Sequence, residues 1–347
     1  MIQELTAQYK KDLPFVAYRK PGNTRVHVLL QKEKTSFQTT DFTEKGFVFA
    51  PFDLKNPAYY IPWSKADLLV LPFQNDSSDI NFFPEEKIRK EEKNEHLLLV
   101  KKGIETIQNG GFQKTVISRK QEVKITAENP LLIFKMLLKK YSTAFCYCWF
   151  HPQTGLWMGA TPEGLMNVEA GFLKTMALAG TQKYRGALDV SWGEKEKEEQ
   201  EMVTQFILST LKDKLENPEI SEVESFRAGK LLHLKTAISG KLAHPNLKEI
   251  ICGLHPTPAV CGLPKEAAKN FILQNENYDR SFYTGFLGEL NGYEKTDLYV
   301  NLRCMKVETQ KAVLFVGGGI TKDSNPEAEW EETIHKAGTM LEVLGKI

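Results

Sequence analysis

Residues 312–336, AVLFVGGGITKDSNPEAEWEETIHK, contain the features around which the rest of the chain is organised. The apolar run at 313–316 predicts a buried strand. The three glycines at 317–319 end this run and allow the backbone to approach another group closely. Ser324 as N-cap and Pro326 in the first turn predict the start of a helix. A strand, a glycine turn and a helix start together can bind a charged small molecule.

The predicted helix carries a row of charged side chains. Glu329, Glu332 and Lys336 recur at spacings of three and four residues, so they share one face. The row suits a binding site, but it also suits an ordinary surface salt bridge between Glu332 and Lys336. This stretch alone leaves both interpretations open.

Composition limits the classes of protein that fit. The 347 residues can bury a sizeable core in one large or two ordinary domains. A net charge of +1 favours neither nucleic acid nor an anionic membrane as partner. No apolar run approaches the ~18 residues of a membrane span, and the N-terminus lacks the apolar region of a signal peptide. The five cysteines lack regular spacing, which indicates reduced thiols, so we expect a cytoplasmic protein.

The chain shows one candidate boundary. Short strand-like runs separated by prolines occupy residues 1–73, and the segment 74–95 is polar and charged. We therefore expect residues 1–95 to be a strand-rich N-terminal part of the same fold as residues 96–347. Helices are predicted at 97–108, 129–140, 194–215, 246–252 and 264–274, and strands at 112–120, 144–150, 156–160, 172–179, 231–240 and 282–290. The strands come in pairs and runs, which favours an α+β fold with large antiparallel sheets.

Two charged residues have ambiguous positions. Glu199 lies four residues before Val203 and so extends the apolar stripe of the helix predicted at 194–215. A carboxylate on a buried face needs a partner or a cation, unless Glu199 lies in a frayed first turn. Arg303 alternates with aliphatic residues, so it points away from their face, either to solvent or into a polar site.

Taken together, the motifs of the chain resemble those of the chorismate-utilising enzymes, which include isochorismate synthase, salicylate synthase, the large component of anthranilate synthase and aminodeoxychorismate synthase. The resemblance covers roughly residues 97–345, and among its members isochorismate synthase is the most similar. The matching stretches, in family order, are FQKTVISR (112–119), GATPEGL (159–165), ALAGT (177–181), EEQEMVTQ (198–205), LLHLKTAISG (231–240), LHPTPAVCG (254–262), RSFYTGFLG (280–288), VNLRCMKV (300–307) and GGGITKDSNPEAEWEETIHK (317–336).

The resemblance implies a single large α+β domain of two layered, mainly antiparallel sheets with flanking helices around a central cleft, and residues 96–347 would be its chorismate-binding catalytic core. It implies Mg²⁺ as cofactor, held by Glu199 and Glu332 against a carboxylate of the substrate chorismate; Mg²⁺ commonly uses one or two protein carboxylates in this way. The residues implied to contact the substrate are Gly180, Thr181, His233, Thr236, Tyr283, Arg303, Gly318, Gly319 and Lys336.

Two further matched residues would carry the reaction. Lys114 matches the general base of members that use water, and Glu163 matches the general acid. In isochorismate synthesis Lys114 would deprotonate the water that attacks ring carbon 2, and Glu163 would protonate the hydroxyl that leaves carbon 4. The lysine must be neutral and the carboxyl must be protonated for these roles, so both need environments that disfavour charge.

The same positions separate activities within the family. Ammonia-using anthranilate synthases typically lack the lysine at position 114, and aminodeoxychorismate synthases typically have a lysine where this chain has Ala179. We therefore expect water as nucleophile, with isochorismate synthase favoured over salicylate synthase. The short chain shows no amidotransferase domain, and we expect a monomer without such a subunit. A synthase fed by a missing amidotransferase and a non-catalytic chorismate-binding homologue remain alternatives.

The chain departs from the family pattern at one helix position. The family usually has histidine where this chain has Gln200. Adjacent helix residues point about 100° apart, so Gln200 is not required to touch a metal held by Glu199. Glu198 is an alternative ligand if the register differs.

Overall fold

The fold is built from two large antiparallel sheets, seen in a computed structural model that describes residues 1–73, 85–86, 90–125, 129–229, 231–244, 246–292 and 295–345. Among these residues each sheet has ten strands. In the order of their pairing, the first sheet contains β16 (Gly262–Leu263), β8 (Lys114–Lys124), β20 (Lys311–Ile320), β19 (Cys304–Glu308), β10 (Gly155–Thr161), β9 (Phe145–His151), β1 (Phe15–Arg19), β2 (Arg25–Gln31) and β6 (Ala66–Pro72), and β7 (Glu85–Glu86) also pairs with β8.

The second sheet contains β13 (Leu215–Ile220), β15 (Leu231–Leu242), β12 (Phe172–Lys183), β11 (Gly164–Glu169), β18 (Lys295–Val300), β17 (Phe286–Gly292), β4 (Gly46–Ala50), β5 (Ala58–Pro62) and β3 (Phe37–Thr39), with β14 (Glu224–Ala228) paired to β15. The helices are α1 (Ile2–Lys10), α2 (Lys90–Gln108), α3 (Leu132–Lys140), α4 (Glu194–Leu211), α5 (Leu247–Leu254), α6 (Lys265–Asn275) and α7 (Pro326–Val343), with a 3₁₀ turn at Trp63–Lys65. The predicted α+β class with two large antiparallel sheets is confirmed.

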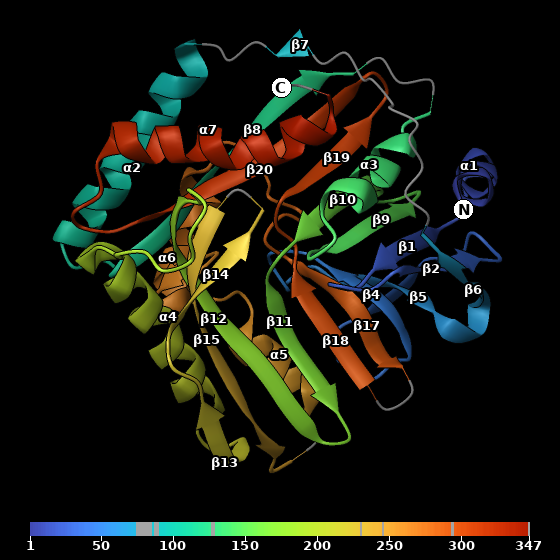
Figure 1. Ribbon diagram of the computed structural model, residues 1–347, viewed down its shortest axis with the longest axis horizontal. Coiled ribbons are helices and arrows are strands. Elements are labelled where there is room, and N and C mark those ends of the chain that lie inside the picture. Colours follow the sequence, from blue (N-terminus) through green and yellow to red (C-terminus); the bar gives the residue numbers. More distant parts are fainter. Residues whose placement is uncertain are drawn as a thin grey trace.

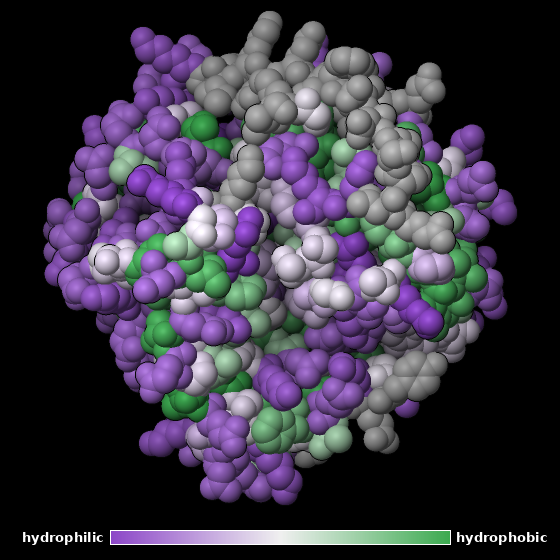
Figure 2. Space-filling view, in the orientation of Figure 1, coloured by the Kyte–Doolittle hydropathy of each residue, from purple (hydrophilic) through white to green (hydrophobic). Residues whose placement is uncertain are grey.

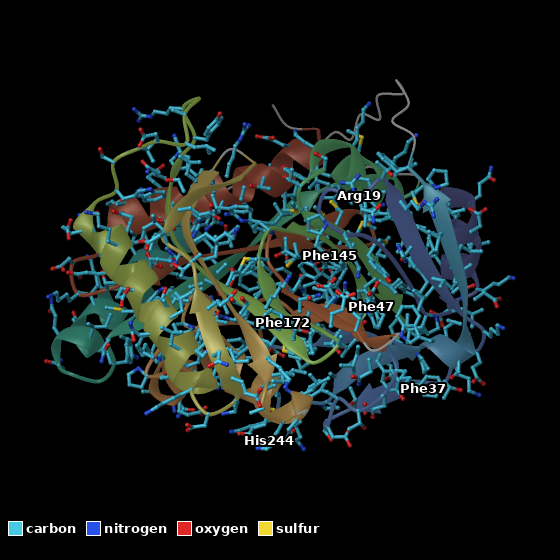
Figure 3. The ribbon with its side chains drawn as sticks, turned by 60° about the horizontal axis from the view of Figure 1, so that its bottom comes forward. Arg19, Phe37, Phe47, Phe145, Phe172 and His244 are labelled. Atoms are coloured by element: carbon cyan, nitrogen blue, oxygen red, sulfur yellow. The ribbon has the colours of Figure 1, made fainter. Side chains whose placement is uncertain are left out.

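Helices cover the outer face of each sheet, and aromatic side chains fill the space between the sheets (Figures 1 and 3). Helices α1, α3 and α7 pack on the first sheet, and α4 and α5 pack on the second. Between the sheets, Phe49 stacks on Phe282 with ring centroids 4.3 Å apart, and Trp157 stacks on Phe315 at 5.2 Å. Such pairs contribute about 0.5–1.5 kcal/mol each beyond their burial. The outer surface in Figure 2 is largely hydrophilic.

The N-terminal strands are divided between the two sheets. Strands β1, β2 and β6 belong to the first sheet, whereas β3, β4 and β5 belong to the second. Helix α1 was missed, although Leu5 on it is fully buried. Most of the predicted boundary segment 74–95 lies outside the described residues, and from Lys90 onward it is helical.

The glycine run does not end its strand, contrary to the prediction. Strand β20 continues through Gly317, Gly318 and Gly319 because their backbones pair with β8 from Ser118 to Val116, and ladder hydrogen bonds need no side chain. Strand β12 likewise runs past Ala179 to Lys183, across an irregularity.

Three other boundaries differ from the prediction. The N-cap of α7 is Asn325, whose side chain accepts a hydrogen bond from Ala328 N, while Ser324 Oγ accepts one from Thr321 N. Residues 281–284 form a turn before β17. Arg303 follows β18 rather than lying in it, with a left-handed φ of 47°.

Candidate active site

A cleft lies between the two sheets, bordered by β8 and β20 on one side and by β12 and β15 on the other. The space between its walls is about 730 Å³ when the solvent-open mouth is included. Most of the predicted site residues line it: Glu163, Gly180, Thr181, Glu199, His233, Tyr283, Arg303, Gly319, Glu332 and Lys336. Because cations and carboxylates both line it, the cleft suits a small polar, anionic ligand.

Lys114 and Glu199 form an ion pair at the base of the cleft. Lys114 begins β8 and its side chain is fully buried, and its Nζ lies 2.8 Å from Glu199 Oε1. Gly319 makes room for the pair, because a Cβ there would lie 2.7 Å from Glu199 Oε1 and 3.2 Å from Lys114 Cε.

Glu199 is held in its ionised form. It lies in the second turn of α4, which excludes the alternative of a frayed first turn. Burial by itself would raise the pKa of Glu199, but Lys114, Lys336 and Lys195 together outweigh burial, and the pKa is lowered.

Glu163 has the opposite charge preference. It lies in the short connection between β10 and β11, and its carbonyl accepts a hydrogen bond from Val300 N. Burial raises the pKa of Glu163 to about 8, although Lys114, Arg303 and Lys336 oppose the shift. The carboxyl group is therefore mainly protonated at neutral pH and can donate a proton.

Further carboxylates approach the opposite face of β20. A Cβ on Gly318 would lie 3.3 Å from Glu329 Oε2 and 3.8 Å from Glu332 Oε1. Glu329 Oε1 pairs with Lys195 Nζ at 2.8 Å, whereas its Oε2 is buried without a hydrogen-bond partner among the described residues. Glu332 Oε1 lies 2.6 Å from Lys336 Nζ. The predicted Glu332–Lys336 salt bridge therefore exists, but at the cleft.

The arrangement of carboxylates fits a Mg²⁺ ion. Burial disfavours the charge of Lys195, yet the charges of Glu329, Glu332 and Glu199 hold its pKa above the ordinary value. The three carboxylates therefore all lie near the Lys195 ammonium group. Carboxylate oxygens are the donors that Mg²⁺ prefers, and one or two suffice when water and substrate oxygens complete the shell. Within the described parts of the chain, no three His, Cys, Asp or Glu side chains form a closed metal-binding group. Glu199 and Glu332 are the residues that would hold the ion.

His233 is neutral and offers an acceptor to the cleft. Burial, followed by the charge of Arg303, lowers the pKa of His233 to about 3. Its Nδ1 lies 2.8 Å from the Gly180 carbonyl and must carry the proton to donate to it. The buried Nε2 then presents a lone pair, which no described protein group uses. Thr181 Oγ1 lies 3.3 Å from Nδ1.

Arg303 and Tyr283 line the cleft near Lys336. Arg303 Nη1 donates to Thr339 Oγ1 at 3.4 Å, so Arg303 points into a polar site rather than to solvent. Burial lowers the pKa of Arg303 and raises that of Tyr283. Lys336 Nζ donates to the Gly317 carbonyl at 3.0 Å. A guanidinium and an ammonium at one cleft suit a dianionic ligand.

Three predicted residues do not line the cleft. Lys114 reaches it only through Glu199, and Gly318 faces the carboxylates of α7. Thr236 lies on the face of β15 opposite His233, since the two are three residues apart in a strand. There it accepts a hydrogen bond from Gln200 Nε2 at 3.1 Å.

The sequence argument missed Lys195, and it named Glu329 and Gln200 without assigning either residue to the site. Lys195 and Glu329 form the ion pair between α4 and α7, and the spacing of Glu329 to Glu332 was the available signal. Gln200 is 2% exposed and also bonds the Ala177 carbonyl, so it faces the second sheet and not the carboxylates. Glu198 is exposed and does not line the cleft.

The fold and cleft define a class of enzyme-like α+β proteins with a small-molecule site between two antiparallel sheets. The chain belongs to the chorismate-binding enzyme family, whose model matches residues 63–345. It is 31% identical over 258 residues to the salicylate biosynthesis isochorismate synthase of Pseudomonas aeruginosa, covering 72% of this chain and 54% of that protein. It is 33% identical over 201 residues to isochorismate synthase EntC of Escherichia coli, covering 55% and 51%. The match thus spans about half the length of these relatives.

Solved structures agree on the fold. Menaquinone-specific isochorismate synthase MenF of Escherichia coli superposes with a TM-score of 0.82 at 21% identity, covering 96% of this chain and 89% of that one. Anthranilate synthase component I of Streptococcus pneumoniae gives 0.68 at 20% identity, covering 94% and 89%. These confirm the predicted fold. Among the described residues no helix is long and apolar enough to span a membrane.

Proposed function

We propose that this protein is a Mg²⁺-dependent isochorismate synthase, which converts chorismate to isochorismate. The observation that carries the proposal is the contrast between two carboxyl groups at one cleft. The pKa of Glu163 is raised to about 8, while that of Glu199 is lowered beside Lys114. Two carboxyl groups whose pKa values are shifted in opposite directions are typical of a site with one proton donor and one ionised group that binds a cation. The isochorismate synthases among the relatives support the same reaction.

The proposed reaction needs a base and an acid at one substrate. Lys114 Nζ takes a proton from the water whose oxygen bonds to ring carbon 2. Both ring double bonds shift by one position, from C1=C2 and C5=C6 to C1=C6 and C4=C5. The bond from carbon 4 to its hydroxyl breaks, and Glu163 gives the proton that lets this hydroxyl leave as water. One water enters and one departs, so the product is an isomer of the substrate. A proton must then return from Lys114 to Glu163 before the next turnover.

The other groups bind and orient the substrate. Arg303 and Lys336 suit a carboxylate of chorismate, and the neutral His233 suits a hydroxyl donor. Mg²⁺ held by Glu199 and Glu332 would neutralise and orient the other carboxylate. Lys114 is paired with Glu199 in the structure, so its proposed role as base requires that Glu199 leaves this ion pair and binds another cation.

The test is product analysis. The purified protein is incubated with chorismate and Mg²⁺, with and without ammonium, and products are identified by chromatography with mass detection. A product isobaric with chorismate but different in retention supports the proposal. Salicylate with pyruvate would make the protein a salicylate synthase. Aminated products that need ammonium would overturn water as nucleophile, and absence of conversion with retained binding would indicate a non-catalytic homologue.

A further inference from the structure

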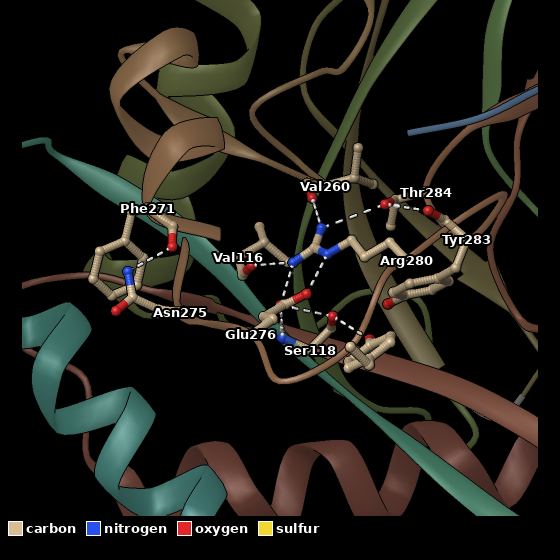
Figure 4. A network of polar contacts seen from close by, with 10 residues as sticks. Val116, Ser118, Val260, Phe271, Asn275, Glu276, Arg280, Tyr283 and Thr284 are labelled. Carbon is tan, nitrogen blue, oxygen red and sulfur yellow. Dashed lines mark hydrogen bonds and ion pairs between the residues drawn. The ribbon is translucent and has the colours of Figure 1, made fainter. Parts of the chain in front are cut away.

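A buried ion pair lies behind one wall of the cleft, outside its lining. Arg280 and Glu276 are four residues apart in the non-helical segment that follows α6 (Lys265–Asn275), and their side chains are 1% and 3% exposed. The two N–H groups at Arg280 Nε and Nη2 meet the two oxygens of Glu276 at 2.7 and 2.6 Å (Figure 4). This two-point pairing fixes the guanidinium plane.

The remaining donors of Arg280 reach two separate segments of the cleft wall. Nη2 also donates to the carbonyl of Val116 at 2.6 Å, and Nη1 donates to the carbonyl of Val260 at 2.9 Å. Val116 and Val260 both line the cleft, and neither is near Arg280 in sequence. One side chain therefore connects the strand of Lys114 with the segment before β16.

The pair also replaces a neighbouring strand along β8. β16 pairs with β8 only at Lys114 and Thr115. Beyond it, Arg280 donates to the Val116 carbonyl, and Glu276 Oε1 accepts from both the backbone N–H and the Oγ of Ser118 at 2.8 Å. The backbone groups along this edge thus find side-chain partners in place of a strand.

Arg280 begins the turn that presents Tyr283 to the cleft. Ser281 and Thr284 have left-handed φ angles of 51° and 59°, which non-glycine residues adopt only when the surroundings hold them. Arg280 Nη1 lies 3.4 Å from Thr284 Oγ1, and the carbonyl of Arg280 accepts from Tyr283 N at 2.9 Å. The guanidinium also lies 5.9 Å from the Tyr283 ring centroid.

We propose that Arg280, held by Glu276, is a positioning residue that sets the distance between the strand of Lys114 and the turn of Tyr283. The inference rests on the proposed function, because Lys114 serves there as the base and Tyr283 lines the cleft that would hold the substrate. Displacements of about 1 Å can reduce turnover on the order of a hundredfold, so a clamp on both segments matters to the reaction.

The test compares two buried arginines. Arg280→Lys keeps the charge but loses the planar fork. The matched control is Arg19→Lys: Arg19 is 3% exposed and bonds the carbonyls of Leu138 and Tyr141, outside the cleft lining (Figure 3). Per folded molecule, we expect Arg280→Lys to lower kcat roughly tenfold and raise KM for chorismate several-fold. Arg19→Lys should change stability but neither constant.

A purely structural role would give a different result. If kcat of Arg280→Lys falls only in proportion to its folded fraction, with unchanged KM, the proposal is wrong. If Arg280→Lys does not fold, Glu276→Gln, which keeps one acceptor, is measured in its place with the same expectation and the same overturning result.

Amide hydrogen exchange separates this proposal from the proposed function, because it needs no turnover. In the Arg280 or Glu276 variant, the amides of Ser118 and Thr284 should exchange faster than in the wild type, and in Arg19→Lys they should not. Unchanged exchange at both amides would overturn the clamp even in an active enzyme. If these amides exchange faster in the variant but the wild type itself has no activity, the clamp stands and the proposed reaction is refuted instead.

Discussion

Replacing Lys114 with methionine tests the proposed base most directly. The side chain is fully buried and its amine lies 2.8 Å from Glu199, so Met keeps the apolar stem and removes only the charged group. General base catalysis contributes about 10²–10⁴-fold, which corresponds to roughly 3–5 kcal/mol in the barrier. We therefore expect kcat to fall by that factor, while the dissociation constant for chorismate changes little.

The same variant should lose stability, because it leaves the Glu199 carboxylate without its cation. Removing one partner of a buried pair costs about 3–5 kcal/mol, and the 16% exposure of Glu199 puts the expected loss at the lower end. The folded-state pKa of Glu199 is lowered, so the pair contributes above the unfolded value of about 4.3 and is lost as pH falls through the folded value. The double variant Lys114→Met/Glu199→Gln should regain most of the stability but no activity.

Product formation and urea unfolding are measured on the wild type, both single variants and the double variant. The reasoning is refuted if Lys114→Met turns over within about threefold of the wild type, since a true base contributes far more. It is also refuted if the double variant is no more stable than Lys114→Met, because the instability would then not come from an uncompensated carboxylate.

Three further predictions concern the same cleft. Glu163→Gln should abolish turnover at every pH and change the pH dependence of stability. Because the folded-state pKa is raised to about 8, the carboxyl group ionises first in the unfolded wild type, which therefore loses stability between about pH 4.5 and 8. The variant should lack this loss, which amounts to several kcal/mol at pH 8 in urea unfolding. Gly319→Ala should reduce turnover strongly, because its Cβ would lie 2.7 Å from Glu199 Oε1, whereas Gly318→Ala, with 3.3 Å as its closest contact, should retain most activity; similar losses in both would contradict the geometry. Glu332→Gln should raise the Mg²⁺ concentration for half-maximal turnover and weaken Mg²⁺ binding by calorimetry at least roughly tenfold, and an unchanged titration would remove Glu332 from the ligands.

Local patterns in the sequence were sufficient for the class of the fold. Alternation and helical spacing depend on neighbours a few residues away, so β9, β10 and α4 to α6 were predicted close to their observed bounds. Boundaries failed where tertiary pairing overrode propensity. The glycines at 317–319 lie inside β20 because β8 supplies their ladder partners, and no local signal carries that information.

The sequence by itself supplied candidates for the reacting groups: Lys114, Glu163, Glu199 and Glu332 are those that the ordered motifs of the resemblance imply. Only the tertiary structure decided their protonation states and which side chains face the cleft. Burial raises the pKa of Glu163. The pKa of Glu199 is lowered by cations that include Lys114, which is 85 positions away in the chain. Thr236 faces away from the cleft because successive side chains of β15 point to opposite faces of the sheet. Arg280 acquires its proposed role by donating to carbonyls on segments distant in the sequence. Charge state and orientation depend on desolvation and on neighbours that folding brings together, which residue spacing does not encode.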